Sequence, residues 1–224
     1  MKLSLYQLDT RFRDQYGHLL AGVDEAGRGP WAGPVVSAAV ILPPEVQIDG
    51  INDSKLLSPE KRSKLFDIIQ QQALAWAVGL AGPEVIDRIN ILQATYQTMR
   101  QAVADLRCQP DIVVVDGRLI PRFSARQVAF PRADGLSASV AAASILAKVT
   151  RDRLMVEAHK LYPQYGFDQH KGYGTPDHQK ALARFGPCEI HRKSFAPIQA
   201  LFSRKSGILV RCQGEREGAV LASD

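Results

Sequence analysis

Acidic side chains follow apolar stretches at two places in the sequence. Asp24 and Glu25 end an apolar segment that begins at Leu19, and Asp116 follows three consecutive valines. A buried carboxylate is costly unless it is paired, hydrogen-bonded or bound to a metal ion, and neighbouring carboxylates raise one another's pKa. A divalent cation resolves this conflict. Carboxylate ligation suits Mg²⁺ or Mn²⁺, and a pair of such ions can activate water and stabilise the leaving oxygen in phosphodiester hydrolysis.

A plainer interpretation is that each acid closes a strand before a turn. Adjacent residues of a strand face opposite sides, so Asp24 and Glu25 can share a site only where regular strand geometry ends. The glycines at positions 22 and 27 favour such an ending. The glycine-rich stretch after Glu25 matches no nucleotide-binding loop. The second strand-terminal acid favours a metal site over the plainer interpretation.

These acids meet if the strands that carry them are neighbours in one sheet. The order of apolar runs predicts an α/β fold with a mixed five-stranded sheet, three antiparallel strands and then parallel strands, flanked by helices. Ligands of such sheets collect at the carboxyl ends of strands. The predicted strands are 19–27, 35–42, 73–81, 111–117 and 126–130, and helices are predicted after Ser58, from Glu84, over 136–162, after Thr175 and over 196–202, the last two as a C-terminal helical extension.

The composition predicts one globular domain. A chain of 224 residues with 46% hydrophobic content can bury a sizeable core, so residues 1–202 are expected to form the domain and 203–224 a flexible tail. The net charge of +5 favours a polyanionic partner. Three cysteines without CxxC spacing support neither a disulfide framework nor a cysteine zinc site, and no apolar run reaches the length of a membrane span. A soluble, cytoplasmic protein that does not contact membranes is therefore expected.

Six blocks of the sequence resemble bacterial ribonuclease HII, in the order that the family has them. They lie between Ala21 and Phe202 and read GVDEAGRGPWAGPVV, NDSKLLSPEKR, VVVDG, SASVAAASILAKVTRDRLM, HKGYGT and HRKSFAPI. The resemblance implies an RNase H-like fold. It also implies an endoribonuclease that hydrolyses the RNA strand of RNA–DNA hybrids and cuts at single ribonucleotides in duplex DNA, leaving 3′-hydroxyl and 5′-phosphate ends.

The resemblance also implies roles for individual residues. The acids that would hold Mg²⁺ or Mn²⁺, two ions with substrate bound, and carry out catalysis are Asp24, Glu25, Asp116 and Asp134. The residues that would bind the substrate are Gly27, Arg28, Gly29 and Tyr173, of which the tyrosine stacks on a ribose. Further candidates for phosphate contacts are Lys55, Lys148, Arg151 and Arg153, although a charged helical face is the commoner explanation for the last three.

Other features of the sequence are given plainer interpretations. His170, His178 and His191 lack zinc-site spacing and are interpreted as surface or substrate-side groups. Gln199–Phe202 faintly resembles short sliding-clamp-binding peptides, but a plain helix end with an apolar contact is favoured. A monomer is expected.

Two other functions are weighed against the endoribonuclease. A DNA-junction or strand-transfer nuclease of the same fold would cleave duplexes made only of DNA. A non-catalytic nucleic-acid-binding protein would lack one of the four acids, yet the sequence contains them all.

Overall fold

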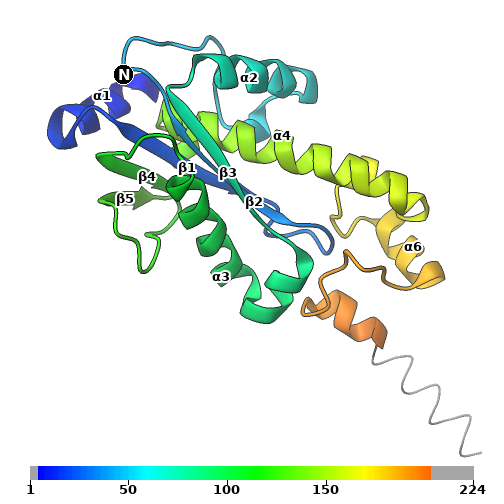
Figure 1. The fold of residues 1–224 in the computed structure, drawn as a ribbon. Coiled ribbons are helices and arrows are strands. Elements are labelled where there is room, and N and C mark those ends of the chain that lie inside the picture. Colours follow the sequence, from blue (N-terminus) through cyan, green and yellow to red (C-terminus); the bar gives the residue numbers. More distant parts are fainter. Residues whose placement is uncertain (1–4, 203–224) are drawn as a thin grey trace, which may run out of the picture.

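The computed structural model describes residues 5–202 and contains one mixed sheet (Figure 1). Its strands are β1 (Leu20–Ala26), β2 (Val35–Ile41), β3 (Ala75–Ala81), β4 (Ile112–Asp116) and β5 (Gln127–Phe130). The strand order is β3-β2-β1-β4-β5. β2 pairs antiparallel with both β1 and β3, whereas β4 pairs parallel with both β1 and β5. The predicted mixed five-stranded sheet is therefore confirmed, and the two acid-bearing strands are neighbours.

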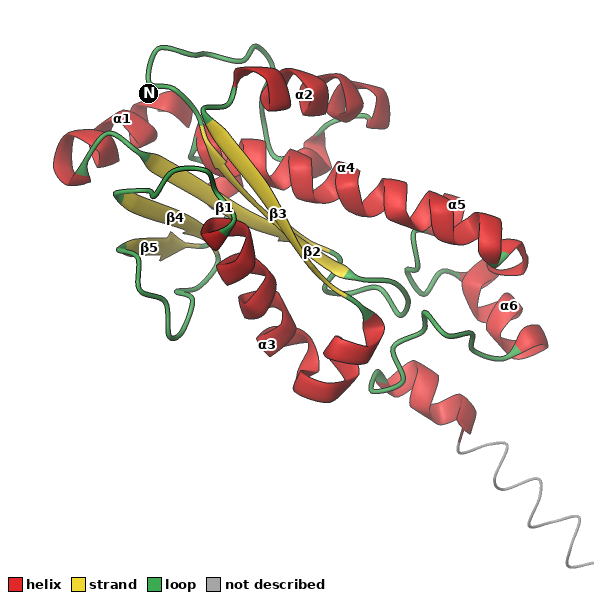
Figure 2. Ribbon diagram, in the orientation of Figure 1, coloured by secondary structure: helices red, strands yellow, loops and turns green. Residues whose placement is uncertain are grey.

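Helices cover both faces of this sheet (Figure 2). They are α1 (Leu5–Tyr16), α2 (Pro59–Gln72), α3 (Pro83–Ala104), α4 (Ala138–Leu161), α5 (Phe167–His170) and α6 (Pro176–Phe185), and residues 196–202 are also helical. α2 and α4 pack with β2 in one apolar cluster, and α3 packs with β1 and β4 in another. Short 3₁₀ turns η1 (Ser54–Leu56), η2 (Ala133–Gly135) and η3 (Pro163–Tyr165) join these elements.

Local sequence explains where several helices begin. The hydroxyl of Ser58 accepts from the N–H of Lys61 and Pro59 occupies the first turn of α2, as expected of an N-cap followed by proline. Ser137 caps α4 in the same way through the N–H of Val140. Small residues then let α4 lie very close to β1, because a Cβ on Gly22 would come within 2.1 Å of the backbone of Ser139.

Helix α1 was not expected from the sequence, because its residues are mostly polar. Two buried polar side chains attach it to the rest of the fold. Asp9 accepts hydrogen bonds from the backbone N–H and the hydroxyl of Ser139, and Arg13 donates to the carbonyl of Leu42. Because these contacts form only in the folded protein, the pattern of apolar residues along the chain could not predict this helix. The tail that was expected to be flexible, residues 203–224, lies outside the described residues.

Candidate active site

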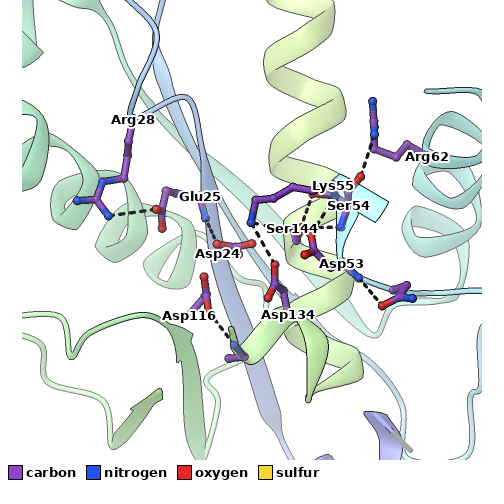
Figure 3. A network of polar contacts seen from close by, with 12 residues as sticks. Asp24, Glu25, Arg28, Asp53, Ser54, Lys55, Arg62, Asp116, Asp134 and Ser144 are labelled. Atoms are coloured by element: carbon purple, nitrogen blue, oxygen red, sulfur yellow. Dashed lines mark hydrogen bonds and ion pairs between the residues drawn. The ribbon is translucent and has the colours of Figure 1, made fainter. Parts of the chain in front are cut away.

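Three carboxylates meet at the carboxyl ends of β1 and β4 (Figure 3). Asp24 comes from β1, Asp116 is the last residue of β4, and Asp134 lies in η2. One carboxylate oxygen from each residue lies within 4.8 Å of the other two. The parallel pairing of β1 with β4 produces this arrangement, because it places the ends of both strands at one edge of the sheet.

The side chain of Glu25 leaves β1 in the direction opposite to that of Asp24. β1 keeps its regular pairing with β2 as far as Ala26, so adjacent side chains alternate between the two faces. Glu25 lines a pocket of about 390 Å³ against α3, and Asp116 also lines that pocket. β1 ends one residue later, at Ala26, and Asp24 and Glu25 together line another pocket. Glu25 is therefore outside the three-acid cluster, but it lies next to the cluster on the side of Asp116.

Backbone and side-chain donors orient the carboxylates of the cluster. Asp24 accepts from the N–H of Glu25 at 2.7 Å, and Asp116 accepts from the N–H of Ala133 at 2.8 Å. The Nζ of Lys55 lies 3.4 Å from an oxygen of Asp134 (Figure 3). Asp24 and Asp116 are therefore each held by a backbone donor, whereas Asp134 is held by the side chain of a lysine.

The protein environment makes full ionisation of this cluster costly. Burial raises the pKa of Asp24 well above its ordinary value, and the charges of Glu25 and Asp116 raise it further. Burial also raises the pKa of Asp134, although Lys55 opposes the change. For Glu25, burial raises the pKa more than the nearby guanidinium of Arg28 lowers it. Carboxylates under mutual repulsion and presenting only oxygen donors fit a hard divalent cation such as Mg²⁺ or Mn²⁺.

A second pocket, of about 270 Å³, lies over the acids and contains the predicted substrate-binding residues. Tyr173 borders it with 45% of its surface exposed, and Lys55 extends into it from η1 with a mostly exposed side chain. The predicted metal ligands and substrate-binding residues that line it are Asp24, Glu25, Gly27, Arg28, Gly29, Lys55, Asp116 and Tyr173. Lys148 and Arg151 also line this pocket, so it brings together residues from five of the six sequence blocks.

Arg151 does not have the exposure that a phosphate contact needs. The residue is fully buried, and its Nε and Nη2 donate to the carbonyls of Pro34 and Ala32. Lys148 borders the pocket but is paired with Asp152 at 2.7 Å. Arg153 is half exposed on α4, and its guanidinium lies 4.3 Å from the ring centroid of Phe66.

The interpretation of His178 and His191 as surface groups was wrong, because both are fully buried. Their Nε2 atoms lie 3.0 Å apart, and their rings pack around Phe167. No local pattern in the sequence indicates this pairing, since the two residues belong to separate segments that meet only in the fold. Sequence reasoning also assigned no role to Arg192, which is buried and donates a hydrogen bond to the carbonyl of Gly27. Its place in the HRKSFAPI block was the available signal.

None of the helices within residues 5–202 has both the length and the apolar character needed to cross a bilayer.

Known proteins resemble this chain in sequence and in fold. The family model for Ribonuclease HII matches residues 21–198. Ribonuclease HII of Burkholderia thailandensis is 53% identical over 189 residues, which cover 84% of this chain and 88% of the relative. The crystal structure of ribonuclease H2 from Pyrococcus horikoshii OT3 has a TM-score of 0.70 and 30% identity, covering 83% of this chain and 98% of that one. RNase HII of Archaeoglobus fulgidus, solved in a complex with PCNA, has a TM-score of 0.65 and 29% identity, covering 81% of this chain and 96% of that one. The chain therefore belongs to the ribonuclease HII family and is an endoribonuclease of RNase H type 2.

Proposed function

We propose that this enzyme cuts the RNA strand of RNA–DNA hybrids and also cuts at single ribonucleotides embedded in duplex DNA, leaving 3′-hydroxyl and 5′-phosphate ends. The observation that carries the proposal is the position of the three-acid cluster directly below the pocket bordered by Gly29 and Tyr173. A sugar that contacts the two pocket residues would have its phosphate near the carboxylates.

The proposed metal ligands are Asp24, Asp116 and Asp134. Glu25, which lies next to Asp116, is proposed as a fourth ligand. The proposed metal is Mg²⁺ or Mn²⁺, with two ions present when the substrate is bound. These ions would supply the positive charge that activates a water and stabilises the leaving oxygen. The hydrogen bonds from Glu25 N–H and Ala133 N–H keep the carboxylates of Asp24 and Asp116 oriented for ligation. Lys55 favours the charged form of Asp134 and so opposes the effect of burial, which raises the pKa of that carboxyl.

The turn at Gly27, Arg28 and Gly29 is the proposed reader of the ribose. A 2′-hydroxyl is the group that distinguishes a ribonucleotide from its deoxy counterpart, and reading it requires a close approach to the sugar. Gly29 has no side chain to hold the backbone away from the sugar. Tyr173 presents an exposed ring beside Gly29, where it can stack on a sugar.

Two proposals concern partners and assembly. The Archaeoglobus fulgidus relative was solved in complex with PCNA, and residues 199–202 are the candidate clamp contact in this chain. Residues 196–202 are helical and Ile198 is buried in an apolar cluster, which supports the helix-end interpretation as well. Co-elution with a sliding clamp that is lost in Phe202→Ala would support the contact.

A cytoplasmic monomer is proposed, and light scattering tests the monomer.

The function is tested with three duplexes that differ in their sugars. One contains only DNA, one contains a single embedded ribonucleotide, and one is a long RNA–DNA hybrid. Each is incubated with Mg²⁺ or Mn²⁺, with and without EDTA, and the ends of the products are mapped. We expect cleavage of the second and third duplexes only, abolished by EDTA. Comparable cleavage of the all-DNA duplex would instead favour the junction nuclease.

A further inference from the structure

The loop between β1 and β2, residues 27–34, rests on a buried guanidinium. Arg192 is fully buried, and it donates through Nη2 to the carbonyl of Gly27 at 2.6 Å, through Nη1 to that of Arg28 at 3.0 Å and through Nε to that of Gly33 at 3.0 Å. One side chain thus joins both ends of the loop. Its partners are backbone carbonyls of the loop rather than carboxylates, so the loop itself stabilises the buried charge.

Arg151 supports the same loop from α4. Its two hydrogen bonds go to the carbonyls of Ala32 and Pro34, and its guanidinium lies 6.0 Å from the ring centroid of Tyr173. Burial, together with the positive charge of Arg151, lowers the pKa of Arg192 to about 9, so Arg192 is still charged at neutral pH. Two buried cations therefore hold five loop carbonyls inward.

The direction of these carbonyls determines where the loop N–H groups point. In a trans peptide the C=O and the following N–H lie on opposite sides. The carbonyls of Gly27 and Arg28 point toward Arg192, so the N–H groups of Arg28 and Gly29 point away from it. Both of these residues line the pocket above the acids. Arg192 thereby sets the orientation of the donors that are available to a sugar.

The same C-terminal segment also fixes the loop relative to Tyr173. The N–H of Arg192 donates to the carbonyl of Trp31, and the N–H of Trp31 donates to the carbonyl of Gly172, which precedes Tyr173. The loop, Arg192 and Tyr173 are therefore connected through the backbone as one unit.

We propose that Arg192 is a positioning residue for ribose recognition: it orients the Arg28 and Gly29 peptides toward the sugar and keeps them in register with Tyr173. This inference rests on the proposed role of residues 27–29 in reading the ribose. It assigns no contact between Arg192 and the substrate. Arg192 acts only through the loop.

The test compares Arg192→Lys and Arg192→Met with two control variants, Arg13→Lys and Arg13→Met. Arg13 is a buried arginine that donates to the carbonyl of Leu42, which follows the end of β2 that pairs with the start of β1, so its loss reports the general cost of removing a buried guanidinium. Each variant is assayed below its own melting temperature on a duplex with one ribonucleotide and on a long hybrid. The measured quantities are kcat, KM and the ratio of kcat values on the two substrates.

For Arg192→Met we expect kcat on the single ribonucleotide to fall about 100-fold, the scale expected of a misplaced reacting group, with KM little changed. The long hybrid, which offers many ribose contacts, should be affected less, so the ratio of kcat values shifts. Arg192→Lys can donate to some of the same carbonyls and should recover part of the loss. Both Arg13 variants should melt at lower temperature and keep the wild-type ratio.

Several results would overturn the inference. One is an unchanged kcat ratio in folded Arg192→Lys and Arg192→Met, and another is an equal shift in the Arg13 variants. If Arg192→Met does not fold, the lysine variant carries the comparison alone, and wild-type behaviour in it counts against the role. Failure of the wild-type enzyme to cut the embedded ribonucleotide would instead remove the proposed function, independently of Arg192.

Discussion

The ring of Tyr173 lies beside Gly29 with no side chain between them. A Cβ built on Gly29 would lie 3.8 Å from Cε1 of that ring, which is an ordinary van der Waals distance. Gly27 differs, because its φ is +95° and a Cβ there would lie 2.1 Å from Nε of Arg151. A side chain at Gly29 is therefore compatible with the fold, whereas Gly27 is required by it.

Gly29→Val is expected to lower activity without lowering stability. The new methyl groups would extend toward Tyr173 and into the space where a sugar is proposed to sit, while the fold has room for the Cβ. We expect kcat on a single-ribonucleotide duplex to fall at least about tenfold and the free energy of unfolding to change by less than about 0.5 kcal/mol. Steady-state kinetics and urea unfolding measure the two effects. Wild-type kcat in this variant would remove Gly29 from sugar reading.

Gly27→Ala, in contrast, should mainly lower the stability of the fold. A residue with a Cβ is strained at this φ by about 1–3 kcal/mol, and the clash with Arg151 adds to that cost. Thermal unfolding of this variant beside Gly29→Ala checks the difference, since both substitutions add a single methyl group. Equal melting temperatures for the two variants would show that the loop adapts around Arg151.

Asp116→Asn is expected to abolish cleavage while leaving the fold and duplex binding largely intact. The amide keeps the shape and can still accept from Ala133 N–H, but it removes a charged ligand from the cluster. Duplex affinity comes mainly from contacts between basic residues and phosphates. The matched control is Asp111→Asn, because Asp111 accepts from Leu19 N–H near the opposite end of β4. We expect kcat to fall about 1,000-fold or more for Asp116→Asn only, because losing a charged metal ligand removes several kcal/mol of transition-state stabilisation.

The sequence predicted the sheet and the residues of the site better than it predicted how they are supported. Apolar runs and helix caps report local preferences, and the expected strands, together with the helices that begin at Ser58 and Thr175, match the structure. The direction of the Glu25 side chain depends on how far the regular pairing of β1 continues, and the sequence did not define that to the residue. Arg192 contacts a residue 165 positions earlier, and His178 pairs with His191 across 13 positions, so apolar periodicity could not predict either contact.

The buried pair of His178 and His191 should make folding stability sensitive to acid. His178 Nδ1 lies 2.9 Å from the carbonyl of Tyr173, so it donates there and leaves its Nε2 as an acceptor. His191 Nε2 must then donate across the 3.0 Å contact, while its Nδ1 accepts from Cys188 N–H. Protonation of either ring would place two donors against each other. Both histidines are therefore neutral in the folded protein.

Burial lowers the pKa of both histidines to about 4, and the neighbouring ring of His170 adds to the effect. In the unfolded chain each titrates near its ordinary value of about 6.5. Between these pH values the unfolded state binds more protons, so stability must fall as pH falls through this window. The full contribution is present above about pH 6.5. The loss is up to about 1.4 kcal/mol per pH unit for each proton taken up.

Urea unfolding at pH 7.5, 6.0 and 5.0 measures this dependence. We expect the wild-type protein to lose stability steadily across the series. His191→Gln, which removes one titrating group while keeping an amide donor for His178, should show a shallower loss. Because both histidines stay neutral in the folded protein down to about pH 4, their titration should leave the contact between His178 and the carbonyl of Tyr173 intact over this range. The same pH slope in both proteins would show that His191 titrates normally in the fold, contrary to its burial between His178 and Cys188.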